Sequence, residues 1–144
     1  MPAIVLAVVL GGCGGGRVIV HGDTMAPAIK DGDGVVYQEY GGAEPRRSDI
    51  VIVKHAGILR VLRVIGLPGE TVTIANGVVS IGGTALVEPY LAAGTRTESS
   101  RATWPVPPDS YFLLVDHRAS SGADSRNPDL GFVPRSEIVG KAKP

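Results

Sequence analysis

Short apolar runs separated by turn residues make up most of this chain. From Arg17 onward the runs are rich in Val and Ile and end at Gly, Pro, Asn or Asp. Runs of this length with partial alternation are typical of half-buried β-strands. We expect strands at 17–22, at 35–40, as a pair within 50–66 joined around 55–57, as a pair within 71–83, at 110–116 and near 138–139.

Two segments carry the clearest signals. Asn76-Gly77 lies between two β-branched runs, which is the strongest short signal for a β-hairpin. Residues 110–116, SYFLLVD, form a nearly continuous apolar run, which indicates a strand buried on both faces. The chain contains no internal repeat and no strong amphipathic helix. The pattern predicts an all-β domain of several packed sheets or a partly closed barrel.

The first sixteen residues differ from the rest because they carry no charged side chain; Arg17 is the first. A helix over 1–16 would span about 24 Å, short of a bilayer core of about 30 Å, and its glycines disfavour a helix. No basic segment precedes the apolar residues, unlike a typical signal peptide. LGGC at 10–13 loosely resembles a lipoprotein cleavage box, which would place a lipid on Cys13. We expect 1–16 to be a membrane anchor or signal remnant, and 17–144 to be the β domain.

Composition narrows the function classes. The 144 residues suit one domain, and 14 basic against 14 acidic side chains give a formal net charge of +0. No basic run or field favours nucleic acid, so we expect no nucleic-acid partner. A single cysteine excludes an internal disulfide, and the three histidines lack metal-ligand spacing. We therefore expect no metal and no cofactor.

Five separated stretches resemble one family, in order and over about residues 17–142. GDTMAPAIKDGD is similar to G-x-S-M-x-P-T-L-x-x-G-D, and LRVIGLPGE to K-R-V-I-G-L-P-G-D. NGVVSIGGTALVEPY is similar to N-G-x-x-x-I-N-G-x-x-L-x-E-P-Y, VDHRASSGADSR to G-D-N-R-x-x-S-x-D-S-R, and GFVPRSEIVGKA to G-x-V-P-x-x-x-I-V-G-K-A. These are motifs of the signal peptidase I, or leader peptidase, family.

The resemblance implies an all-β fold of antiparallel sheets that forms a partly closed barrel. It implies a domain held at the membrane surface, on the extracytoplasmic side of the bacterial cell membrane. Family members remove signal peptides from exported proteins, so an extended, signal-peptide-like segment is the expected partner. Met25 and Pro27, in the nucleophile loop, are placed along the substrate groove by this resemblance.

The family's chemistry uses a serine nucleophile and a neutral lysine as general base. An alcohol is hardly ionised at neutral pH, so it needs a base within reach, and lysine serves only when burial lowers its pKa. In this chain Thr24 stands at the nucleophile position and Leu62 at the general-base position. Threonine keeps a hydroxyl, although its methyl group stiffens χ1. Leucine cannot accept a proton, so the base is lost.

A substitute base is the alternative. Lys54 lies on the preceding strand, expected across the hairpin from Leu62, and Lys30 sits in a turn; both suit solvated lysines. Histidine is a common general base in proteins, and either His21 or His117 is a candidate partner for the threonine hydroxyl. No spacing in the sequence requires such a contact.

The loop from 116 to 126 preserves more of the pattern. Asp116, Arg118, Ser121, Asp124 and Arg126 all have counterparts in the family motif, with one extra residue between Ser121 and Asp124. The resemblance assigns Ser121 the support of the dyad lysine and makes Asp124 and Arg126 a buried pair that braces the site. With the lysine gone, the serine has lost its partner.

The departures converge on the catalytic positions while the scaffold motifs stay intact, whereas random drift would blur both alike. The leading hypothesis is a signal peptidase-like domain with impaired or absent proteolysis that retains a groove for an extended peptide. The alternative is an endopeptidase that uses Thr24 with His21, His117 or Lys54 as base. Self-cleaving repressors share the Ser–Lys dyad, but this chain carries neither the dyad nor a DNA-binding domain.

Overall fold

Antiparallel strands account for most of the regular structure. The computed structural model describes residues 5–8 and 14–143. Within them lie two short 3-10 helices, η1 (Ser121–Ala123) and η2 (Arg135–Glu137), and twelve strands. The strands are β1 (Val5–Val8), β2 (Gly15–Val20), β3 (Gly34–Gln38), β4 (Ile50–His55), β5 (Ile58–Gly66), β6 (Thr71–Ala75), β7 (Val78–Ile81), β8 (Thr84–Ala85), β9 (Thr103–Pro105), β10 (Ser110–Leu114), β11 (Val133–Pro134) and β12 (Ile138–Lys143).

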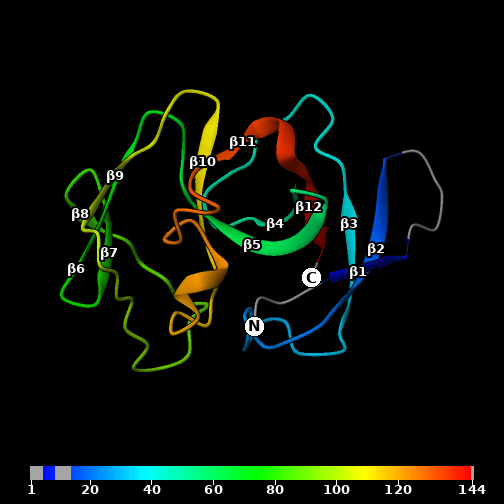
Figure 1. Ribbon diagram of the computed structural model, residues 1–144, viewed down its shortest axis with the longest axis horizontal. Coiled ribbons are helices and arrows are strands. Elements are labelled where there is room, and N and C mark those ends of the chain that lie inside the picture. The colour runs from blue at the N-terminus through cyan, green and yellow to red at the C-terminus, as the bar shows by residue number, and fades with distance from the viewer. Residues whose placement is uncertain (1–4, 9–13, 144) are drawn as a thin grey trace.

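The strands form two sheets that lie side by side, the smaller at the left of Figure 1. The larger has the order β1-β2-β3-β12-β4-β5-β10-β11, and the smaller β8-β7-β6-β9. The larger sheet curls until β1 also meets β5, at the single register pair Val5 with Leu59. Within the described residues the sheet closes no further than this pair. The prediction of an all-β fold with antiparallel sheets is confirmed.

Both hairpins predicted from the sequence are present. β4 and β5 pair along their whole common length around the turn at Ala56-Gly57. β6 and β7 are joined by Asn76-Gly77, with φ of 53° and 79°. Two consecutive positive φ angles define the type I′ turn, whose twist matches that of paired strands. Asn and Gly tolerate this conformation, which explains why the sequence signal is so specific.

The core divides into two clusters, and β10 separates them. Leu113 and Tyr111 point into the larger cluster, between the strands of the larger sheet. Phe112 and Leu114 point into the smaller cluster, where the ring of Phe112 lies 4.9 Å from that of Trp104. A strand covered on both faces has no solvent-facing positions for polar residues, which accounts for the continuous apolar run. The prediction that residues 110–116 contain a strand buried on both faces is confirmed.

The N-terminal segment contributes to the larger sheet. Val5–Val8, inside the segment expected to be an anchor or signal remnant, forms β1 and pairs with β2. β2 begins at Gly15, two residues before the expected start of the β domain. Cys13, the expected lipid acceptor, lies outside the described residues. Among the residues described, no helix has the length and apolar character needed to cross a membrane.

Candidate active site

Thr24 lies in a tight loop directly after β2. The strand ends at Val20, and Gly22, at φ 96°, turns the chain. Two aspartates hold the loop: Asp31 Oδ1 accepts the Gly22 N–H at 2.7 Å, and Asp23 Oδ1 accepts the Asp31 N–H at 3.2 Å. The loop presents Thr24 at the edge of the larger core, only 8% exposed.

The two residues placed along the groove by the sequence have different surroundings. Met25 is completely buried and belongs to the larger core cluster. Pro27 is exposed and follows a cis peptide bond from Ala26. The side chain of Met25 therefore anchors the Thr24 loop to the core, while Pro27 lies at the surface.

Leu62 occupies the general-base position in the middle of β5. It is 1% exposed and packs in the larger core cluster. The register pairs Leu62 with Val51 and pairs Lys54 with Leu59. The expectation that Lys54 lies across from Leu62 was wrong, because the turn at 56–57 fixes which residues face each other.

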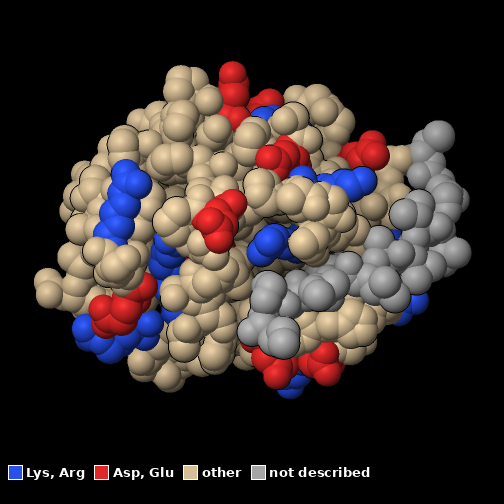
Figure 2. Space-filling model, in the orientation of Figure 1, with Lys and Arg blue, Asp and Glu red and all other residues tan. Residues whose placement is uncertain are grey.

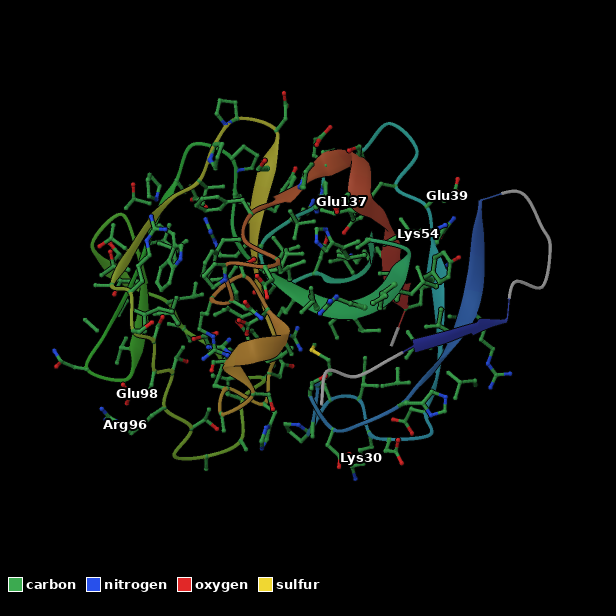
Figure 3. All side chains as sticks on the ribbon, viewed as in Figure 1. Lys30, Glu39, Lys54, Arg96, Glu98 and Glu137 are labelled. Carbon is green, nitrogen blue, oxygen red and sulfur yellow. The ribbon has the colours of Figure 1, made fainter. Side chains whose placement is uncertain are left out.

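In the described part of the chain, no candidate base is hydrogen-bonded to the threonine hydroxyl. Among residues 5–8 and 14–143, no hydrogen bond joins Thr24 Oγ1 to an amine or imidazole nitrogen. His21 and Lys54 are exposed. Figure 3 shows Lys54 well separated from Lys30, which sits on the same loop as Thr24. The ring of His117 is engaged locally, with Nδ1 2.9 Å from Ser120 Oγ.

The backbone nevertheless ties the 116–126 loop to the Thr24 loop. The N–H of His117 donates to the carbonyl oxygen of Thr24 at 2.8 Å. Farther along, Ser125 Oγ accepts the N–H of Leu113 at 2.9 Å, and the Ser125 N–H donates to the Leu113 carbonyl at 3.0 Å. The loop is thus bound both to β10 and to the nucleophile position.

Three ion pairs with little solvent exposure surround this region in the described part of the chain. The first joins Arg63, next to Leu62, to Asp116 after β10. Arg63 Nε donates to Oδ1 at 2.8 Å and Nη2 to Oδ2 at 2.6 Å, a bidentate arrangement. Arg63 Nη1 donates to the Ser48 carbonyl at 2.9 Å. The pair fixes the end of β10 against β5.

The second pair joins Arg118 to Glu88, which comes from the loop after β8. Arg118 is fully buried, and its Nη1 donates to Glu88 Oε1 at 3.1 Å and to Thr97 Oγ1 at 2.7 Å. Tyr90 donates its hydroxyl to Glu88 Oε2 at 2.7 Å, and its ring lies 3.8 Å from the Arg63 guanidinium carbon. Burial first, and then the Glu88 charge, raise the pKa of Tyr90 above its ordinary value.

The third pair joins Asp124 to Arg126 within the loop itself. Arg126 Nε donates to Asp124 Oδ1 at 2.9 Å and Nη2 to Oδ2 at 2.7 Å. Oδ2 also accepts the N–H of Val115 at 3.0 Å. Arg126 Nη1 reaches the Arg118 carbonyl at 2.8 Å, so the second and third pairs are connected.

Ser121 lies apart from these contacts. It opens η1 and is exposed. The hydrogen bond from Asn127 Nδ2 to the Gly122 carbonyl, 2.9 Å long, holds the turn that follows. The geometry around Thr24 therefore combines a braced scaffold with a hydroxyl that, within the described residues, is not hydrogen-bonded to any candidate base.

Comparison with known proteins decides the family. The family model described as "Signal peptidase, peptidase S26" matches residues 1–144, the entire chain. This chain belongs to the signal peptidase family. The recognition made from five motifs is confirmed.

Several signal peptidases are similar over most of this chain. Signal peptidase I of Bacillus amyloliquefaciens is 36% identical, and the match covers 87% of this chain and 70% of that protein. Signal peptidase I S of Bacillus subtilis (strain 168) is 33% identical, with 98% and 82% covered. A signal peptidase I structure from Enterococcus faecalis V583 is 34% identical with a TM-score of 0.59, covering 69% of this chain and 97% of that one.

This signal peptidase-family chain uses two bracing residues that sequence reasoning did not assign. Glu88 and Thr97 hold Arg118 from 30 and 21 positions away. Glu88 was visible as the acid of the EPY motif, but no spacing connected it to Arg118. Thr97 gave no signal at all. Within the described residues, no group of His, Cys, Asp and Glu is arranged to hold a metal ion.

Proposed function

We propose that this signal peptidase-family domain binds an extended, signal-peptide-like segment without hydrolysing it, at the extracytoplasmic membrane surface. One observation carries the proposal: the general-base position holds Leu62, 1% exposed within the core. An isobutyl group cannot take the proton that Thr24 must lose to attack a carbonyl. The neighbouring guanidinium of Arg63 stays protonated and is engaged by Asp116.

The scaffold around the lost base supports retention of binding. The ion pairs of Arg63, Arg118 and Arg126 are all formed, so the loop beside Thr24 remains fixed. Peptide recognition by strand addition depends on backbone groups and side-chain pockets and needs no general base. Ser121 has no role in this proposal beyond its place in η1, and Asp116 and Asp124 act as bracing residues.

The test is the double variant Thr24→Ser with Leu62→Lys. Cleavage of a synthetic signal-peptide substrate is followed by mass spectrometry beside the parent chain and both single variants. The parent and Thr24→Ser should show no cleavage because each lacks a general base at position 62, and the double variant should cleave the substrate. Leu62→Met, which keeps the volume without an amine, is the matched control. Cleavage by the parent that Thr24→Ala abolishes would overturn the proposal.

The alternative, cleavage by Thr24 with a substitute base, has one observation in its favour. The His117 N–H donates to the Thr24 carbonyl, so this histidine is adjacent in space. If His117 were the base, parent activity would vanish in His117→Gln. The same assay with His21→Gln and Lys54→Met distinguishes the other two candidates.

A further inference from the structure

The strand β1 pairs with two different strands of the larger sheet, β2 and β5. It pairs antiparallel with β2 through four register pairs, from Val5 with Val20 to Val8 with Arg17. The same Val5 is the partner of Leu59 on β5. β1 therefore lies between two strands that are far apart in the sheet order. Because both run antiparallel to β1, β2 and β5 run parallel to each other.

These two strands lead to the catalytic positions. Thr24 follows Val20 by four residues, and Leu62 follows Leu59 by three, both on the same side of Val5. β10 pairs with β5 only from Arg63 onward. Residues 60–62 of β5 have no strand partner on this edge among the described residues. The edges of β2 and β5 thus form a slot that a single extended strand can enter, and beyond Val5 these two strands lead to the Thr24 loop and to Leu62.

We propose that β1 is an intramolecular occupant of the peptide slot and competes with an incoming peptide. The inference rests on the proposed peptide-binding function for the identity of the competing ligand. When β1 is released, the facing edges of β2 and β5 offer backbone groups without a strand partner in the described chain, and an extended segment of either origin satisfies these groups by strand addition. An incoming peptide must displace Val5–Val8 before it can pair with both β2 and β5.

The competition has a definite thermodynamic form. A strand tethered to its own slot has an effective concentration in the millimolar range, so an external peptide binds only to the fraction of molecules in which β1 is released. The apparent Kd is the intrinsic Kd divided by that fraction. In the described part of the chain one register pair, Val5 with Leu59, joins β1 to β5, which keeps release from β5 accessible. The device therefore weakens binding without abolishing it.

A reversible cross-link tests the proposal in the full chain. Val8 and Arg17 are register partners, so Val8→Cys with Arg17→Cys, in a Cys13→Ser background, places two thiols at paired positions of β1 and β2. Facing positions on paired strands bring Cβ atoms close to the separation that a disulfide spans. Val8→Cys alone is the matched control. Ala7→Pro, which removes one backbone N–H from β1, is the opposite perturbation.

Two fluorescent peptides serve as probes, read by anisotropy. One carries the AIVLAVVL sequence of residues 3–10 between lysines, and the other is a signal-peptide segment ending in Ala-X-Ala. Binding of the first to the oxidised protein should be at least about tenfold weaker than to the reduced protein. Ala7→Pro should bind it more tightly than the parent does.

Each outcome is decisive. Equal binding by the oxidised and reduced forms overturns the proposal, as does failure of the thiols to form a disulfide or absence of binding in every form. If the AIVLAVVL probe shows the difference while the Ala-X-Ala peptide binds to none of the forms, the slot and its occupant are supported and the proposed function fails. If both probes show it, both are supported.

Discussion

Removal of the Asp124 carboxylate should destabilise the fold far more than removal of a comparable surface carboxylate. Asp124 and Arg126 are two residues apart, and their side chains are 0% and 1% exposed. Asp124→Ala leaves a guanidinium without its counter-charge and also takes the acceptor from the Val115 N–H. The matched control is Glu98→Ala, because Glu98 pairs with Arg96 at the same spacing with side chains 69% and 64% exposed.

The magnitude follows from these surroundings. Breaking a buried pair by removing one partner costs about 3–5 kcal/mol, and an unpaired buried N–H adds about 1–3 kcal/mol. Local relaxation makes the two terms less than additive, so we expect a loss of about 4–6 kcal/mol in the free energy of unfolding. Glu98→Ala should change it by less than about 1 kcal/mol, since exposed pairs contribute little.

Urea unfolding followed by tryptophan fluorescence measures the difference. Trp104 is the sole tryptophan in the sequence and is 4% exposed, so its emission reports on the smaller core. With an m-value of about 2 kcal/mol/M, the midpoint of Asp124→Ala should fall by about 2–3 M while m stays constant. At this m-value, a difference of about 0.5 M between two midpoints corresponds to about 1 kcal/mol in the free energy of unfolding. If the midpoints of Asp124→Ala and Glu98→Ala differ by less than about 0.5 M, the reasoning about the buried pair is refuted.

Three further outcomes are expected from the same unfolding assay. Leu62→Ala should cost about 2–5 kcal/mol and Leu62→Met less than about 1.5 kcal/mol; equal losses would show that position 62 is not tightly packed. The hydrogen bond from Arg47 lowers the pKa of Glu70 in the folded protein. This shift stabilises the fold above the ordinary glutamate pKa of about 4.3, and the stabilisation is lost as the pH falls through the lowered pKa of the folded state. Glu70→Gln should therefore flatten the acid side of the stability–pH curve, and a parallel curve would contradict the pairing. Gly77→Ala should cost about 1–2 kcal/mol because Gly77 has φ 79°, and no loss would exclude the type I′ turn.

The sequence predicted those parts of the fold that local chemistry controls. A few adjacent residues determine each of three features: the turn at Asn76-Gly77, the strand pair around 55–57 and the doubly buried strand β10. The positions of Thr24 and Leu62 came from motifs, and the structure places Thr24 in the loop after β2 and Leu62 within β5. Local pattern therefore located these strands, while the roles of the site residues stay predictions from the motifs.

Contacts between residues far apart in the chain could not be predicted from the sequence. The contact of Arg118 with Glu88 and Thr97 depends on how the two sheets lie side by side, and no local pattern encodes that. Lys54 was expected opposite Leu62, although the turn at 56–57 places Val51 there. β1 was missed because an apolar, glycine-flanked segment suits a membrane anchor as well as a strand.

The bracing ion pairs explain how the fold accommodates leucine at position 62. Arg63 pairs with Asp116, Arg118 with Glu88 and Arg126 with Asp124. Within residues 5–8 and 14–143, these three carboxylates therefore have partners without an amine at position 62. Replacing a lysine by Leu62 therefore leaves no uncompensated buried charge and adds apolar contacts. A lysine returned to this position would enter a site without a free counter-charge, where burial lowers its pKa. A neutral amine is the form that can deprotonate a hydroxyl, so under the proposed function a lysine at position 62 would supply the base that the double variant tests.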